Sequence, residues 1–169
     1  RLPQRITQLD LSEASHDDIR DILLLSRPDN VIFDEVRNLE DFRLFCDLRL
    51  SGTGLAGVVH ATEPIDAVQR FVGKTELGMI PHIIDTVIFI KDGGISDVLK
   101  LKMEMKVPAG MKDLDLARPV VVVSEFGPGL PRFELFSFGN ETVVVPVEPT
   151  DRDELEGISR RIEKELEGY

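Results

Sequence analysis

Two neighbouring carboxylates, Asp34 and Glu35, follow directly after the apolar run Val31-Ile32-Phe33. An acid at the end of a buried strand can hold a Mg²⁺ ion, usually through its water shell. The next acid can then polarise a water molecule that attacks a terminal phosphate. The pair therefore supplies two of the three parts that nucleotide hydrolysis requires. The same pattern is also an ordinary exit from a strand into a loop, so the pair alone leaves both interpretations open.

A second apolar segment, residues 55–60, also ends in a side chain that can do chemistry, His60. The carboxyl ends of parallel strands meet at one edge of a sheet. We therefore expect Asp34, Glu35 and His60 to converge there, close enough to share one phosphate. The alternative for His60 is a histidine that only satisfies the end of a strand.

The third part of a nucleotide site, a cradle for the phosphates, is absent from the sequence. No Gly-x-x-x-x-Gly-Lys-Ser/Thr stretch occurs in the 169 residues. Such a loop provides the backbone amides and the lysine that bind most of the phosphate charge. Gly52-Thr53-Gly54 is not followed by a lysine, and Asp92-Gly93-Gly94 is expected to form a hairpin turn. We interpret the chain as a fragment of a longer protein and expect no appreciable ATPase activity from it alone.

The spacing of apolar residues predicts alternating helices and strands in the first half of the chain. Ser15 and Asp18 have the spacing of a capping box, and Arg27-Pro28 is expected to end that helix. This succession is typical of parallel strands joined by helical crossovers. The expected helices begin near Ser15, Asn38 and Thr62, with Pro64 early in the third, and the expected strands cover 30–34 and 55–60.

After Pro81 the pattern changes to a period of two, which is typical of antiparallel strands with one solvated face. The alternation is clearest over residues 98–107, where leucine, methionine and valine alternate with lysine and glutamate. Gly139-Asn140 is expected to form a second turn, and a final helix is expected from about Asp151. The expected strands cover 83–91, 98–107, 120–123, 133–138 and 142–147.

Three stretches, residues 27–40, 51–54 and 57–62, together resemble the type II/IV secretion ATPase superfamily, the PilT-like motors of pili and secretion systems. The shared features are a proline–aspartate, an apolar strand, glutamate-x-arginine, a threonine–glycine loop and a histidine box. The secretion enzymes usually have glycine before the glutamate, whereas Asp34 stands here and restores a conventional Walker B pair. In this respect the chain is similar to an archaeal branch in which the ATPase lies between a PIN domain and a KH domain.

The resemblance implies a fold and a domain division. Residues 1–107 would form the C-terminal half of a RecA-like P-loop ATPase core, with parallel strands and helices. Residues 108–169 would form an appendage of antiparallel β-hairpins and a C-terminal helix.

The resemblance also implies roles for individual side chains. Glu35 resembles the catalytic glutamate, Asp34 occupies the metal-holding Walker B position, and His60 resembles the residue that senses the terminal phosphate. Arg37 matches the arginine of the superfamily and is expected to couple the site to a neighbouring subunit. Two flanking positions of the cofactor site, without assigned roles, are matched by Thr53 and Arg70.

The implied cofactors are ATP and Mg²⁺, and the implied assembly is a homo-hexameric ring. In the PIN and KH branch the intact protein would act on nucleic acid as a helicase or branch-migration enzyme; in the pilus or secretion branch it would assemble proteins. Two other hypotheses stay open. They are a non-catalytic assembly module that kept the motor fold, and an unrelated α/β domain.

The net charge of −11 repels nucleic acid as a whole, so binding requires flanking domains or a local basic patch. Lys100, Lys102 and Lys106 are expected to share one strand face, where they either meet phosphates or keep that face solvated. No apolar run approaches the ~20 residues of a membrane span. The single cysteine, Cys46, is expected to be a buried free thiol, which favours a reducing, cytoplasmic location. His82 is expected to be structural, and His16 a solvated residue at a helix start.

Overall fold

The computed structural model describes residues 6–10, 13–111, 116–127 and 129–147. The chain folds as two compact units, Arg1–Val59 and His60–Tyr169, and each is described by itself. Within the described ranges no helix is long and apolar enough to cross a membrane. The helix expected from about Asp151 lies outside these ranges, and the expected domain division at residue 107 stays a prediction.

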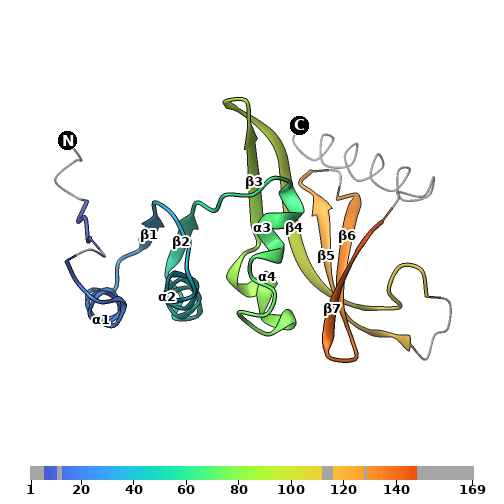
Figure 1. Cartoon of the computed structure of the whole chain (residues 1–169), viewed down its shortest axis with the longest axis horizontal. Coiled ribbons are helices and arrows are strands. Elements are labelled where there is room, and N and C mark those ends of the chain that lie inside the picture. Colours follow the sequence, from blue (N-terminus) through green and yellow to red (C-terminus); the bar gives the residue numbers. More distant parts are fainter. Residues whose placement is uncertain (1–5, 11–12, 112–115, 128, 148–169) are drawn as a thin grey trace, which may run out of the picture. The chain divides into compact units, whose positions relative to one another are not determined.

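The helices of the first unit begin where the sequence predicts, and both begin at capping boxes. The N–H of Asp18 donates to Ser15 Oγ at 3.1 Å, and the N–H of Asp41 donates to Asn38 Oδ1 at 3.0 Å. The first helix ends at Arg27, whose φ of 47° is left-handed. Figure 1 shows the elements of this unit in order: α1 (His16–Ser26), β1 (Asn30–Phe33), α2 (Leu39–Leu50) and β2 (Gly54–Gly57).

The strands β1 and β2 pair in parallel, as expected, from Asn30 opposite Gly54 to Phe33 opposite Gly57. The ring of Phe45, from α2, packs edge-on against Phe33, with ring centroids 5.4 Å apart. A Cβ atom at Gly57 would lie 2.9 Å from Cε2 of Phe45, so only glycine permits this close approach of helix and strand. Cys46, also on α2, is buried and free as expected, and burial raises the pKa of its thiol.

The expected RecA-like core of parallel strands is wrong. In the part of the chain that the structure describes, the parallel sheet has two strands, and the larger sheet has five strands that are all antiparallel. β1 is also not buried on both faces as expected, because Ile32 is 80% exposed while Phe33 is buried. Helix α2 packs on one face of the β1–β2 sheet, so only alternate side chains of β1 are shielded from solvent.

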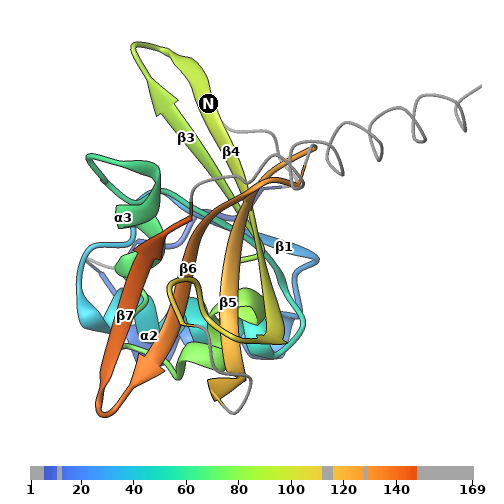
Figure 2. The same cartoon turned by 90° about the vertical axis from the view of Figure 1, so that its right-hand side faces the viewer.

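The second unit is built on the antiparallel sheet β3-β4-β5-β6-β7, which curls in the view of Figure 2. The antiparallel strands are confirmed, but Ile83 belongs to a helical turn with Pro81 rather than to a strand. Asp92 and Gly93 form the expected turn with positive φ angles of 51° and 78°, a backbone that suits the twist of a two-residue hairpin. The elements are α3 (Pro64–Gln69), the 3₁₀ turn η1 (Leu77–Met79), α4 (Ile80–Ile83), β3 (Thr86–Lys91), β4 (Gly94–Lys106), β5 (Arg118–Glu125), β6 (Pro131–Phe138) and β7 (Glu141–Pro146).

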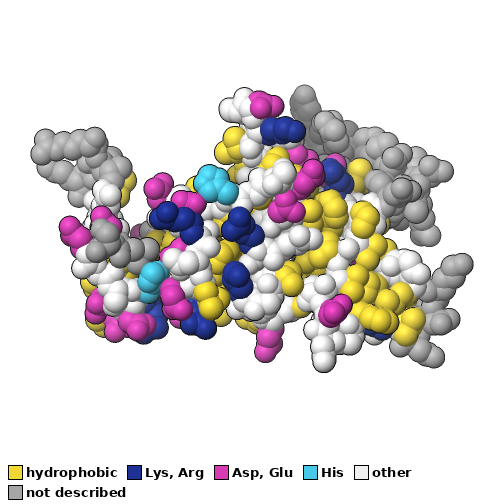
Figure 3. Space-filling view, viewed as in Figure 1, with side chains coloured by type: hydrophobic (Ala, Val, Ile, Leu, Met, Phe, Trp, Pro, Cys, Tyr) yellow, Lys and Arg dark blue, Asp and Glu magenta, His cyan; other side chains and the backbone are white. Residues whose placement is uncertain are grey.

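Both faces of this sheet are covered near β5. On one face Leu101 lies opposite Val123, and both are buried, with η1 contacting β5 and β6. On the other face Val120, Val122 and Phe136 form a buried cluster, against which Met111, Val143 and Val145 pack. Hydrophobic side chains gather over β5, β6 and β7 in Figure 3. The interior of the second unit therefore has an apolar layer on each side of β5.

Candidate functional site

The loop after β1 carries Asp34, Glu35 and Arg37 on the surface of the first unit. Val36 is buried between them, and its N–H donates to the carbonyl of Val58 at 2.8 Å. Arg37 Nε lies 3.3 Å from Glu35 Oε2, and the two side chains are 73% and 29% exposed. An exposed ion pair contributes little to stability, but this one places the Arg37 guanidinium beside the Glu35 carboxylate.

The backbone of this loop is held by Asp41, in the first turn of α2. Oδ2 of Asp41 accepts hydrogen bonds from the N–H of Arg37 at 2.9 Å and of Asn38 at 3.1 Å. Oδ1 of Asp41 lies 2.8 Å from Nε2 of His16. The sequence predicts a solvated His16, but its side chain is half-buried. Burial by itself raises the pKa of Asp41, but the hydrogen bonds from His16, Asn38 and Arg37 outweigh it and hold the pKa below its usual value.

Our sequence reasoning did not assign Asp41 to the site. Its only signal is the spacing Asn38-x-x-Asp41, a capping box that thousands of ordinary helices share. The bond to the N–H of Arg37 is local, four residues apart. The bond to His16, 25 residues away in sequence, depends on the packing of α1 against α2.

Asp34 fits a Mg²⁺ site as one ligand of several. No group of three or more His, Cys, Asp or Glu side chains that could hold a metal occurs among the described residues. Mg²⁺ is commonly held by only one or two carboxylates, together with waters and substrate phosphates. The carboxylate of Asp34 is exposed at the end of β1, which suits an ion that arrives with a nucleotide.

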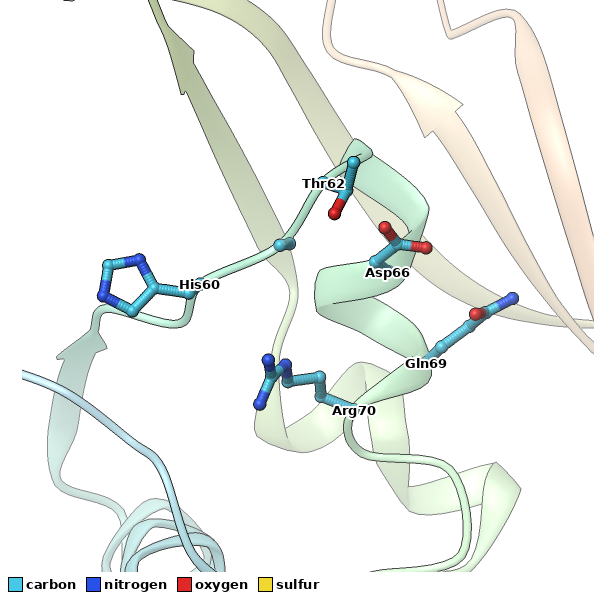
Figure 4. Close-up of a pocket in the computed structure, with 6 residues that line it drawn as sticks. His60, Thr62, Asp66, Gln69 and Arg70 are labelled. Carbon is cyan, nitrogen blue, oxygen red and sulfur yellow. The ribbon is translucent and has the colours of Figure 1, made fainter.

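A second group of polar residues lines a hollow beside α3 in the second unit (Figure 4). Pro64 is the first residue of α3, and Glu63 is its N-cap instead of the expected Thr62. Figure 4 shows the Arg70 side chain reaching back toward the segment that carries His60. An imidazole and a guanidinium on one hollow can bind an anionic group such as a phosphate. The lining residues are His60, Ala61, Thr62, Asp66, Gln69 and Arg70.

The site residues that the sequence predicts thus fall into two groups. Glu35 and Arg37 are in contact in the first unit, and His60 and Arg70 line one hollow in the second. Thr53 belongs to the turn that ends α2, where its N–H donates to the carbonyl of Leu48 at 3.2 Å. The expected convergence of Glu35 with His60 on one phosphate stays a prediction.

The lysine face of β4 is only partly open. Lys100 and Lys102 are exposed, but Lys106 Nζ lies 2.6 Å from Oε1 of Glu134, which is 1% exposed. The second carboxylate oxygen of Glu134 accepts the N–H of Ala109 at 2.6 Å. Lys106 therefore neutralises a buried carboxylate, and two of the three expected lysines face solvent.

No known family model matches the chain, but individual proteins do. A protein of Sulfolobus acidocaldarius named Holliday junction branch migration ATPase PINA is 49% identical over 146 residues, which are 86% of this chain and 29% of that protein. An uncharacterized KH and PIN-domain containing protein of Methanocaldococcus jannaschii is 48% identical over 147 residues, which are 87% of this chain and 23% of that protein. The chain spans less than a third of the length of either relative.

These names correct the resemblance to PilT-like secretion ATPases, since neither relative is named as a pilus or secretion motor. The motifs behind that resemblance are short, and the same fold and site types occur in proteins with different functions. One relative is instead named for Holliday junction branch migration, and the other for its KH and PIN domains. The chain is thus similar to a segment of a protein named as a Holliday junction branch migration ATPase and to a segment of a protein named as containing KH and PIN domains.

Proposed function

We propose that the intact protein containing this chain is an ATPase that acts on branched DNA, as a helicase or branch-migration enzyme. The identity of 49% over 146 residues with a protein named as a Holliday junction branch migration ATPase carries this proposal. Assembly as a homo-hexameric ring and a cytoplasmic location belong to the same proposal. The phosphate cradle that the 169 residues lack would be supplied by another part of the intact protein.

The chain's own residues would serve a bound ATP in three ways. Glu35, oriented by Arg37 at 3.3 Å, polarises the attacking water, because a carboxylate can accept its proton as the phosphate bond breaks. Asp34 would hold Mg²⁺, which when bound offsets the charge of the phosphates. The third way is contact with the nucleotide or with a neighbouring subunit. The residues proposed for it are His60, Arg37, Thr53 and Arg70.

The first test is ATP hydrolysis by the intact protein with and without a synthetic four-way DNA junction. We expect Mg²⁺-dependent hydrolysis that the junction stimulates, and ATP-dependent conversion of the junction into duplex products. The 169-residue chain alone should show no appreciable hydrolysis, because it lacks the lysine and amides that bind the phosphates. An intact protein that binds the junction without hydrolysing ATP would instead favour a non-catalytic assembly module.

Lys100 and Lys102 are candidates for contact with DNA, because both are exposed on one face of β4. Changing both to glutamine in the intact protein is expected to weaken junction binding. It should also reduce the slope of log K against log salt by about 2 units if each lysine neutralises one phosphate. Arg43→Gln is a suitable control, since Arg43 is paired with Glu40 at 2.8 Å on α2. An unchanged slope in the double variant would leave these lysines with the role of keeping the strand face solvated.

A further inference from the structure

The contacts of Asp41 extend beyond those of an ordinary helix cap. In a capping box the side chain at the third helical position accepts the N–H of the cap residue, as Asp41 does from Asn38 at 3.1 Å. Asp41 also accepts the N–H of Arg37 at 2.9 Å and contacts Nε2 of His16 at 2.8 Å. Asp41 is 4% exposed, and its bonds to His16, Arg37 and Asn38 are partly buried.

A continuous series of contacts therefore joins α1 to the proposed catalytic residue. Nε2 of His16 fixes one oxygen of Asp41, the other oxygen fixes the backbone of Arg37, and the Arg37 side chain lies 3.3 Å from Oε2 of Glu35. The first two steps are buried or half-buried. Only the last step is exposed, and by itself an exposed ion pair holds its partners weakly.

We propose that His16 and Asp41 are positioning residues for Glu35, an inference that rests on the proposed function. The hydrogen bond from the N–H of Arg37 to Asp41 fixes the Arg37 backbone and therefore the position of its Cβ atom. The guanidinium then contacts Glu35 in a narrower range of orientations. A general base that is displaced by about 1 Å from its productive position can lose about 10²-fold in rate. The pair would thus stabilise the transition state without contacting the nucleotide.

Removal and replacement of the His16 contact test this role in the intact protein. His16→Ala is expected to lower kcat for ATP hydrolysis by about 10-fold and to leave KM within about twofold, because the loop acts on the water rather than on bound ATP. His16→Gln should restore most of the rate, since the amide nitrogen of glutamine can replace Nε2 as a donor to Asp41. Glu40→Gln is the matched control, because it removes an exposed carboxylate from the same turn of α2 and should leave both constants unchanged.

A double variant separates positioning from a loss of folded protein. If His16 acts through Glu35, His16→Ala should cause no further loss of rate in a Glu35→Gln background, whereas a smaller folded fraction would lower the rate in either background. An additive loss, or a failure of His16→Gln to restore the rate, would overturn the positioning role. A Glu35→Gln variant with wild-type kcat would overturn the proposed role of Glu35 and the positioning role with it.

Discussion

Glu35→Gln in the intact protein is expected to lower kcat for ATP hydrolysis by about 10²-fold or more. Glutamine has nearly the shape of glutamate but cannot accept a proton from the attacking water. The substitution leaves the buried Val36 and the backbone bonds of Asp41 in place, so the loop should keep its conformation. KM for ATP should change little, because an interaction made only in the transition state affects kcat rather than ground-state binding. Steady-state phosphate release at saturating Mg²⁺ and ATP measures both constants.

The control for this experiment again comes from α2. Glu40→Gln removes one negative charge five residues away, and Glu40 is exposed in an ion pair with Arg43. Its kcat should equal that of the wild type, which excludes a general effect of net charge. Hydrolysis by Glu35→Gln at the wild-type rate would show that another residue orients the water.

Lys106→Gln is expected to destabilise the second unit by about 3 kcal/mol, because it leaves a buried carboxylate without its cation. Lys106 Nζ lies 2.6 Å from Oε1 of Glu134, which is 1% exposed, and the N–H of Ala109 donates to the other oxygen of that carboxylate. Lys102→Gln, four residues earlier on the same face, changes an exposed side chain and should shift stability by less than about 0.5 kcal/mol. Urea unfolding of the two variants should give different midpoints with the same slope.

A third variant tests the same pair from the other side. Lys106→Met combined with Glu134→Leu removes both charges, and Glu134 lies opposite Val122 and Val145 in the sheet. Because an apolar pair can often replace a buried ion pair, the double variant should recover part of the stability that Lys106→Gln loses. Recovery is not complete, because the N–H of Ala109 loses its acceptor on Glu134. Equal midpoints for Lys106→Gln and Lys102→Gln would mean that the Lys106–Glu134 contact does not stabilise the fold.

Much of the local structure is determined by the sequence alone. The capping box at Ser15, the helix cap at Asn38, the stop at Arg27, and the Asp92-Gly93 turn are all found where the residues predict them. The alternation over 98–107 correctly indicates an antiparallel strand with Leu99 and Leu101 buried. These features depend on interactions between residues that are close in sequence, and such interactions can be predicted from a local pattern of residue types.

The residues of the candidate site are predicted in part. An acid pair after an apolar run is visible in the sequence, and the structure places Glu35 beside Arg37. The contact of His16 with Asp41 is not visible in the sequence, because it depends on two helices meeting across 25 residues of chain. Lys106 is misjudged for the same reason, since its partner Glu134 is 28 residues away.

Only the tertiary structure decided how the strands assemble. The apolar run before Asp34 suits a strand covered on both faces, yet Ile32 is 80% exposed because α2 packs on one side of a two-stranded sheet. The succession of helices and strands suited a RecA-like core, whereas the larger sheet is a five-stranded antiparallel one. Helix caps, turns and strand alternation are set by neighbours in sequence, but the partner of a strand and the covering of its faces are set by contacts between distant residues. A local pattern of residue types does not identify those distant partners, because they are determined by how the whole chain packs.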